Sequence, residues 1–507
     1  MNPQPLPAGQ RLWATLALGM ASFMNVLDLT IVNVSIPNIS GDLGVAPSQG
    51  TWAITSYAVA EAIMLPLTGW LAGRLGQVKL FCISTFMFTM ASLLCGMAPS
   101  FEVLLAARVL QGIFGAAMIP MSQTLMLSAY PPEKAGLATG IWAMTTVAAP
   151  IIGPLSGGWL TDNLSWHWVF LINLPVGMLC LFLVYPIFRK RETPKRQLPI
   201  DLVGLVLLMI GVGALQIMLD KGNELDWFES PTVIALGVVA FVGLGVFIIY
   251  EWYDEHPLVD LKLFTQRNFA VGMVCLFIGT IAFFGSTVVL PLWLQTQMGY
   301  TPTWAGRTMA LGGVLAVFLG PIVGANIAKV DARAVASFGF FMFAVYAFVC
   351  ARFTPDVTYG TLAGTRLIMG IGVSCFFLPL ITISLSGISP DRMAGASGLN
   401  SFIRNMGSSV GTATITSLWE HKATMHHARL VENVNTASDN AMGYVGTLQG
   451  LGMNMDSALA TTDRLINQQA YLLSTNAVLC ICGMMMVALI FPIWLAKGPF
   501  SRVAADH

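Results

Sequence analysis

The sequence places a carboxylate inside an apolar segment, where an ionisable side chain can exchange protons. Asp28 lies in the hydrophobic run from Leu12 to Pro37, which is long enough to cross a bilayer core, since a spanning helix needs about 20 residues. A charged carboxylate there costs roughly 2.5–3.5 kcal/mol on insertion scales, so it usually faces a water-filled cavity or a partner. Asn25 makes the same helical face polar. We predict a proton or substrate site; a structural hydrogen bond to a neighbouring helix is the alternative.

Arg108 is the predicted partner of Asp28. Counted from the outer ends of their segments at 1.5 Å per residue, both side chains lie roughly 10–14 Å below the same surface. A nearby guanidinium favours the ionised carboxylate and burial favours the protonated one, so a carboxylate balanced between them can exchange a proton when a cavity changes sides. A purely structural ion pair is the alternative. Glu61 is a second carboxylate near the midplane, and both a proton or substrate site and a helix-packing hydrogen bond are open for it.

The composition is that of a membrane protein with many spans. Of the 507 residues, 56% are hydrophobic and 10% are charged, and the mean hydropathy is +0.73, whereas soluble domains carry about 25% charged residues. The 25 basic and 25 acidic residues cancel, so the charge implies no nucleic-acid partner. The eight cysteines fall inside apolar segments without zinc or disulfide spacing. We expect no metal site.

Fourteen apolar segments are predicted to span the bilayer as helices. They lie near 13–37, 50–72, 79–98, 101–125, 136–160, 168–188, 201–220, 231–251, 268–296, 303–328, 334–352, 358–386, 395–419 and 471–496. Basic residues concentrate in the loops on the side of the termini, most densely at Arg189, Lys190, Arg191, Lys195 and Arg196. By the positive-inside rule, both termini are expected to be cytoplasmic.

The chain also repeats itself. Arg108 and Gly112 recur as Arg366 and Gly370 at one constant offset, which is typical of transporters built from duplicated halves with a site at the repeat interface. The expected organisation is a six-helix half in 1–188, a linker with two inserted helices in 189–267, and a second half in 268–507. The last external loop, 420–470, is polar and far longer than the others. Helices are plausible there over 441–449 and 454–468, with a solvated loop as the alternative.

Two stretches resemble signatures of the major facilitator superfamily. Residues 69–79 resemble its loop between spans two and three, and Arg108 followed by Gly112 resembles its fourth-helix signature. The resemblance implies a cytoplasmic gate, although Gly73 stands where the family usually has an acidic partner for a gating salt bridge. An ordinary glycine-rich turn is the alternative. The candidate gate residues are Gly69, Arg74, Gly76 and Lys79.

A third stretch bears on the direction of transport. Residues 149–158, Ala-Pro-Ile-Ile-Gly-Pro-Leu-Ser-Gly-Gly, resemble the antiporter signature that proton-driven exporters of this superfamily carry and its symporters lack. Prolines and glycines bend a helix and let its neighbour approach closely. A bent packing helix with no bearing on direction is the alternative. The motif residues are Gly153, Pro154, Gly157 and Gly158.

Three further stretches narrow the resemblance. Residues 27–37, 166–177 and 216–227 resemble signatures of the fourteen-helix drug:proton antiporters, so the chain is similar over its whole length to EmrB-type efflux pumps. The resemblance implies an all-α polytopic membrane protein with the major facilitator fold, two six-helix halves plus two inserted helices. It also implies proton-coupled export of hydrophobic toxic compounds across a bacterial inner membrane. The proton motive force would replace a cofactor, and a periplasmic adaptor and an outer-membrane channel would be partners.

The alternatives are export of a specific metabolite or fatty acid, uptake by symport, and a membrane enzyme. The sequence has no phosphate-binding Gly-x-x-x-x-Gly-Lys-Ser/Thr motif, and we identify no catalytic residues. The residues predicted for proton coupling are Asp28, Arg108 and Glu61. Those predicted for the substrate cavity are Asn25, Asn33, Tyr57, Gln111 and Trp142. Those predicted to dock an adaptor are Leu459, Arg464 and Leu465, in the loop 420–470. The alternative is that this loop folds over the cavity as a lid.

Overall fold

Helices make up all the regular secondary structure in the part of the chain that the computed structural model describes, which is residues 5–195, 201–254, 257–327, 329–432, 434 and 438–500. Backbone polar groups in a bilayer must bond within their own segment, which a helix does. Eleven helices in these ranges are long and apolar enough to cross a membrane. They become twelve if α3 (Trp52–Met64) and α4 (Thr68–Leu75), bent by 62°, form one span.

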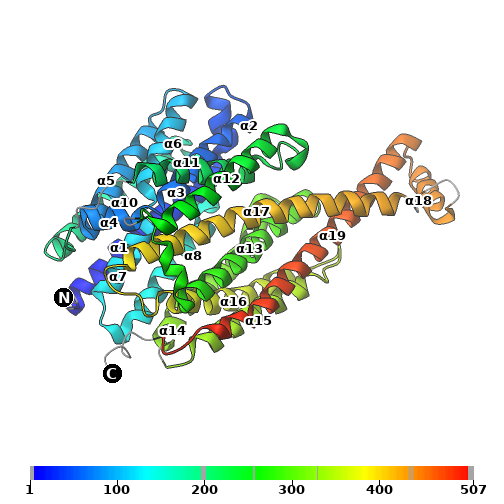
Figure 1. Cartoon of the computed structure of the whole chain (residues 1–507). Coiled ribbons are helices and arrows are strands. Elements are labelled where there is room, and N and C mark those ends of the chain that lie inside the picture. Colours follow the sequence, from blue (N-terminus) through cyan, green and yellow to red (C-terminus); the bar gives the residue numbers. More distant parts are fainter. Residues whose placement is uncertain are drawn as a thin grey trace.

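The N-terminal half contains the helices from α1 to α10 (Figure 1). Besides α3 and α4, they are α1 (Ala8–Asp42), α2 (Pro47–Gly50), α5 (Gln77–Gly96), α6 (Phe101–Gly115), α7 (Met118–Ala129), η1 (Pro132–Lys134), α8 (Ala135–Asn163), α9 (His167–Leu171) and α10 (Asn173–Phe188). α1 packs most extensively on α8, and it also contacts α7 and α10.

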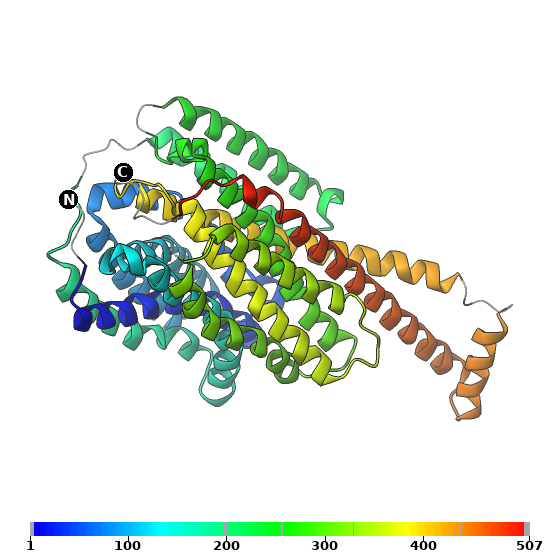
Figure 2. The same ribbon diagram turned by 90° about the horizontal axis from the view of Figure 1, so that it is seen from below.

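The two inserted helices are unequal in burial. α11 (Leu202–Lys221) packs against both α3 and α17, whereas α12 (Pro231–Tyr253) packs mainly on α11 and lies at the edge of the bundle (Figure 2). The short helices η2 (Trp227–Glu229) and η3 (Leu261–Thr265) follow them in turn. α11 therefore contacts helices of both halves.

The C-terminal half ends in a long projection. Its helices are α13 (Arg267–Thr296), α14 (Pro302–Asn326), α15 (Ala332–Cys350), α16 (Tyr359–Leu385), α17 (Met393–Val431), α18 (Asp439–Gly450), α19 (Met455–Leu489) and η4 (Pro492–Leu495). α17 and α19 run beyond the other helices and carry α18 at their tip (Figures 1 and 2). We call this the hairpin end of the molecule, and the opposite end, where both termini lie, the termini end.

Each of the fourteen predicted segments coincides with one helix or with two consecutive helices. Two of these helices, α8 and α17, are not among the eleven or twelve that are long and apolar enough to cross a membrane by themselves. One boundary was wrong: α17 continues to Val431, well into the predicted loop 420–470. The helices expected within this loop over 441–449 and 454–468 are confirmed as α18 and the first part of α19. The last apolar span reaches Leu495, close to its predicted end at 496. The asparagine Asn454 caps α19 by accepting a hydrogen bond from the Ser457 backbone N–H. Of the basic loop residues, Arg196 lies outside the described part.

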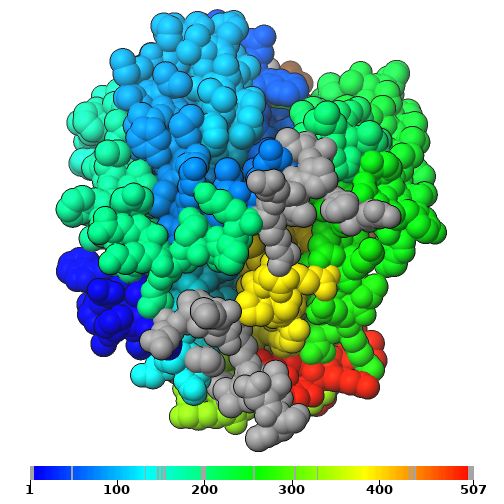
Figure 3. Space-filling view, turned by 60° about the vertical axis from the view of Figure 1, so that its left-hand side comes forward, coloured from blue at the N-terminus to red at the C-terminus, as the bar shows by residue number. Residues whose placement is uncertain are grey.

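The two halves meet closely at the termini end. A methyl group added to Gly69 in α4 would lie 2.5 Å from the Cα of Gly395 in α17, and one added to Gly140 in α8 would lie 2.7 Å from the carbonyl oxygen of Gly320 in α14. Backbones approach this closely only where neither residue has a side chain. Figure 3 brings this end forward, with the start of α17 (yellow) beside the blue and cyan N-terminal half.

Candidate functional site

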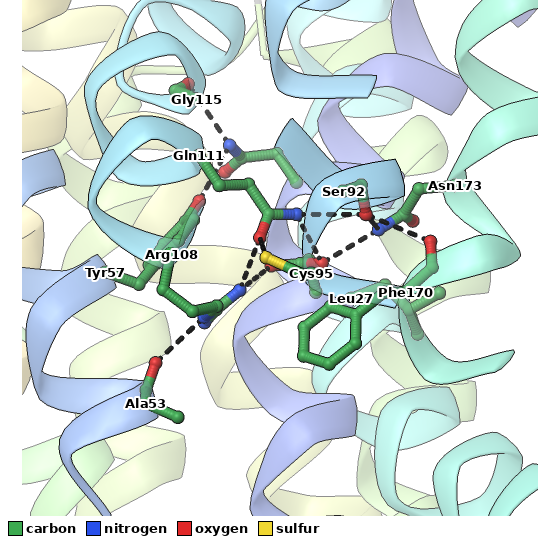
Figure 4. Close-up of polar contacts among 12 residues, drawn as sticks. Leu27, Ala53, Tyr57, Ser92, Cys95, Arg108, Gln111, Gly115, Phe170 and Asn173 are labelled. Carbon is green, nitrogen blue, oxygen red and sulfur yellow. Dashed lines mark hydrogen bonds and ion pairs between the residues drawn. The ribbon is translucent and has the colours of Figure 1, made fainter. Parts of the chain in front are cut away.

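Asp28 lies at the centre of a buried polar cluster between α1, α5, α6 and α10. Its Oδ2 accepts from Arg108 Nη1 at 2.5 Å, and its Oδ1 accepts from Gln111 Nε2 and Asn173 Nδ2, both at 2.8 Å. The side chains of Asp28 and Arg108 are 0% exposed. Figure 4 shows Arg108, Gln111 and Asn173 pointing toward a common centre. Asp28 and Arg108 thus form the ion pair that their depths in the sequence predict.

Arg108 is held from several sides. Its Nε donates to the Ala53 carbonyl oxygen at 2.8 Å and its Nη1 to Gln111 Oε1 at 2.8 Å. The guanidinium also lies 4.3 Å from the centre of the Tyr57 ring. This cation–π contact further stabilises the buried positive charge. Such a buried pair is costly to break, because removing one partner leaves an unpaired charge away from water.

Tyr57 connects this cluster to Glu61. Its hydroxyl accepts from Asn25 Nδ2 at 3.1 Å and donates to Glu61 Oε1 at 3.4 Å. Glu61 Oε2 accepts from Asn405 Nδ2 at 3.3 Å, so the carboxylate joins α3 of the first half to α17 of the second. Both of the alternatives left open for Glu61 therefore retain a structural basis: it makes packing hydrogen bonds and it lines a cavity.

A cavity of about 1480 Å³ lies between the two halves and α11. At the hairpin end it reaches residues near the ends of their helices, such as Asn38, Asp162 and Gln295. At the termini end, the glycine contacts described above bring the halves together. The walls combine aromatic and aliphatic side chains with many polar and charged ones. A concave site that offers both apolar surface and polar groups is suited to small organic ligands.

The structure corrects the predicted cavity lining. Asn33 and Trp142 line the cavity, and the Trp142 indole donates to two serine hydroxyls, those of Ser22 and Ser122. Three of the residues predicted to line it are instead fully buried behind the wall: Asn25, Tyr57 and Gln111. Gln111 turns toward Asp28 and Arg108, whose buried charges need hydrogen-bonding partners. The Tyr57 ring lies against the Arg108 guanidinium, and Asn25 donates to the Tyr57 hydroxyl and to the Gly115 carbonyl oxygen.

The antiporter motif forms the contact of α8 with α1. A methyl group on Gly153 would overlap Thr30, and one on Gly157 would lie 2.7 Å from the Ile31 carbonyl oxygen. Gly158 differs, because its nearest neighbour would be Val34 at 3.8 Å and it lines the cavity. Pro154 lies within α8; its side chain is outside the described part. Only Gly153 and Gly157 are thus close-approach residues toward the helix that bears Asp28.

We expect Gly157→Leu to reduce transport at least tenfold, because the leucine side chain would push α8 away from α1. Substrate binding should persist, since Gly157 faces α1 rather than the cavity. The matched variant Gly158→Ala, for which there is room, should transport at close to the wild-type rate. Transport and binding measured on both purified variants check this; a Gly157→Leu protein that transports normally would contradict the packing role.

The candidate gate residues lie in α4 (Gly69, Arg74), in the turn that follows it (Gly76) and at the start of α5 (Lys79). Gly69 contacts Gly395 of the second half, and Gly76 has φ +92°, a conformation that favours glycine. Glu192, in the segment after α10, accepts from the backbone N–H groups of Val78 and Lys79 at 3.0 and 2.8 Å. Its carboxylate therefore binds the start of α5, whereas Gly73 lies within α4. Arg74 lies over the Trp70 ring at 5.3 Å.

The residues predicted for docking lie on the projecting hairpin. Leu459 and Leu465 of α19 are 46% and 40% exposed, and Arg464 is exposed between them. Val445 and Leu448 of α18 are buried against Ala458 instead, so they stabilise the tip itself.

Sequence reasoning missed several members of the site. Asn173 and Ser92 complete the Asp28 cluster, with Asn173 Nδ2 donating to Ser92 Oγ at 2.9 Å. Asn405, the partner of Glu61, was also not identified. The available signal was a polar side chain in an apolar span, which in a membrane usually faces other helices or a cavity.

Comparison with known proteins agrees with this architecture. The profile of the Major Facilitator Superfamily matches residues 18–412. The chain is 45% identical over 499 residues to the multidrug export protein EmrB of Escherichia coli (strain K12), with 98% of each chain covered. It is 41% identical over 507 residues to the fatty acid resistance protein FarB of Neisseria gonorrhoeae, with 100% of each covered.

Among solved structures, the crystal structure of the human organic anion transporter MFSD10 superposes with a TM-score of 0.61 at 11% identity, covering 96% of this chain and 100% of that one. At this identity the likeness concerns the fold alone. The profile and the relatives lead to one assignment: the chain belongs to the Major Facilitator Superfamily and, within it, to the EmrB-type transporters.

Proposed function

We propose that the protein is a proton antiporter that exports hydrophobic toxic compounds, with Asp28 as the proton-exchanging group. The observation that carries the proposal is the buried Asp28–Arg108 pair, which lies directly behind the wall of a cavity shared by the two halves. The names of EmrB and FarB, a multidrug exporter and a fatty acid resistance protein, support the direction and the kind of cargo.

The cycle follows from the charges. Arg108 pairs with ionised Asp28; a proton arriving at Asp28 neutralises the carboxylate and weakens the pair. α1 and α6, which carry the two residues, can then shift relative to each other, and the glycine contact of α1 with α8 permits sliding. Glu61, at the cavity surface and linked through Tyr57 to the Asp28 cluster, is the second proton-coupling residue that we propose.

The proton motive force is sufficient as the energy source. One proton that crosses inward under about 100 mV supplies roughly 2.3 kcal/mol, and each unit of pH gradient adds about 1.4 kcal/mol. Together they sustain a substrate ratio of tens to hundreds per proton, without ATP. No bound cofactor is part of this proposal.

Proteoliposomes with an imposed pH gradient test the proposal. We expect substrate to accumulate against its gradient while protons move the opposite way, and collapse of the gradient by an ionophore to stop accumulation. Movement of substrate and protons in the same direction would indicate a symporter. Chemical conversion of the substrate would indicate an enzyme.

We also propose an inner-membrane location with both termini cytoplasmic, so that the hairpin end faces the periplasm. The distribution of basic residues supports this orientation. The projecting hairpin would then dock a periplasmic adaptor and, through it, an outer-membrane channel. Burial of the exposed Leu459 and Leu465 side chains by a partner would be favourable, because it removes apolar surface from water.

The double change Leu459→Ser and Leu465→Ser is expected to abolish cross-linking to the adaptor while transport in liposomes remains intact. The matched control is Leu473→Ser, since Leu473 is equally exposed at 41% on the same helix but nearer the bundle. Impaired liposome transport with unchanged cross-linking in the double variant would favour a lid over the cavity instead of a docking site.

A further inference from the structure

The second half contains a buried guanidinium without a carboxylate. Arg366 in α16 is the repeat copy of Arg108, 0% exposed, and it lies in the wall of the cavity. Its Nη1 donates to Met369 Sδ at 3.1 Å and its guanidinium lies 5.3 Å from the centre of the Tyr346 ring. Its Nε and Nη2 have no hydrogen-bonding partner among the described residues.

The repeat shows what was replaced around this arginine. At the offset that relates Arg108 to Arg366, Asp28 corresponds to Ser286 and Gln111 corresponds to Met369. Ser286 is buried and donates to the Phe283 carbonyl oxygen rather than to the guanidinium. The positive charge is therefore retained while its anionic partner is lost. An unpaired charge in a membrane interior is costly and marks a functional site by default.

The charges of the cavity are also segregated. Its positive side chains, Arg366 and Arg404, both come from the second half. Its carboxylates come from the first half and from α11, and two are engaged: Asp220 accepts from Thr55, and Glu61 accepts from Tyr57 and Asn405. Glu61 also lies close enough to Arg404 for their charges to interact. Within the described lining, no carboxylate forms an ion pair with Arg366.

The surroundings of Arg366 suit an amphipathic ligand. Phe283 and Phe377 line the same cavity with their ring centroids 5.5 Å apart, which gives an apolar surface for a hydrophobic body. Met369, which covers Nη1, also lines the cavity. A methionine side chain is flexible and adapts to a neighbouring ligand, so its displacement exposes the guanidinium.

We propose that Arg366 is an anion-recognition site of the export cavity, which selects amphipathic organic anions by pairing with their carboxylate or acidic phenolate. The ligand's anion does for Arg366 what Asp28 does for Arg108, and the planar guanidinium offers two parallel donors to it. The proposal rests on the proposed export function and specifies which compounds the cavity prefers.

The test compares two probes of the same shape that differ in charge, naphthalene-1-acetate and naphthalene-1-acetamide. Their equilibrium dissociation constants are measured by dialysis against the purified full-length protein, without any proton gradient. We expect the wild type to prefer the acetate at least tenfold. Arg366→Gln should remove that preference. Ser286→Asp, which restores the carboxylate of the first repeat, should remove it as well, and Ser286→Ala should keep it.

Equal affinity of the wild type for both probes, or an acetate preference that survives in both Arg366→Gln and Ser286→Asp, would overturn the proposal. If the preference were lost in Arg404→Gln but not in Arg366→Gln, the anion would bind at Arg404, and the proposal for Arg366 would be overturned as well. Melting of each variant in detergent verifies folding, and Ser286→Asp provides a second test if Arg366→Gln is unstable. Because binding needs no gradient, a failure here is separate from a failure of proton antiport.

Discussion

Asp28→Asn is expected to reduce proton-driven export by at least about 100-fold, the loss that removal of a proton-transferring group typically causes. Asparagine keeps the shape and can still accept from Gln111 or Asn173 through its carbonyl oxygen, so insertion and folding should persist. It cannot take up and release a proton. Transport in proteoliposomes under a pH gradient, at equal amounts of inserted protein, measures the effect.

The control for Asp28→Asn is Asp162→Asn, which removes a carboxylate from the mouth of the same cavity and should have little effect on coupling. Facilitated movement of substrate down its own gradient should remain in Asp28→Asn. Wild-type rates of gradient-driven export in this variant would rule out Asp28 as the proton-exchanging group.

Arg108→Ala should be as damaging to export as Asp28→Asn, and the double variant should be little worse than either single one. Residues that act as one unit give non-additive losses, since the second change removes an interaction that is already gone. Stability should show the same coupling. Each single change leaves one buried polar group unpaired, at a cost of about 3–5 kcal/mol for a broken buried pair.

The double variant Asp28→Asn with Arg108→Ala removes both charges. The decrease in its melting temperature should therefore be smaller than the sum of the decreases in the two single variants. The comparison is Asp28→Asn combined with Arg366→Ala, which lie in different halves and should combine additively. In this comparison the losses of transport rate should multiply and the decreases in melting temperature should add. The same behaviour in the Asp28–Arg108 double variant would show that the two residues act independently.

The ion pair could be predicted from the sequence because it depends on one coordinate, the depth of each residue along a spanning helix. Asp28 and Arg108 lie at similar depths, and in a membrane interior opposite charges at one depth have strong reason to pair. The direction in which a polar side chain turns about its helix is a different matter. Tyr57 and Gln111 turn toward Arg108 rather than toward the cavity, and sequence spacing alone does not distinguish the two.

Contacts between distant segments were also beyond the sequence. Glu192 binds the start of α5 from the segment that follows α10, and Asn405 reaches Glu61 across the two halves. Both depend on how the helices pack in three dimensions. The extension of α17 to Val431 was missed for another reason, because its outer part is polar and a search for apolar segments ends where polarity begins.

α17 connects three parts of the molecule as one unbroken rod. Its start, at Gly395, lies at the glycine contact of the termini end, its middle lines the cavity at Thr412, and its end forms one side of the projecting hairpin. At 1.5 Å per residue, its 39 residues measure about 58 Å. A tilt of roughly 10° about its midpoint would therefore move each end by about 5 Å in opposite directions. α17 thus has the geometry of a lever. If the glycine contact at one end separated, the hairpin tip at the other end would move sideways.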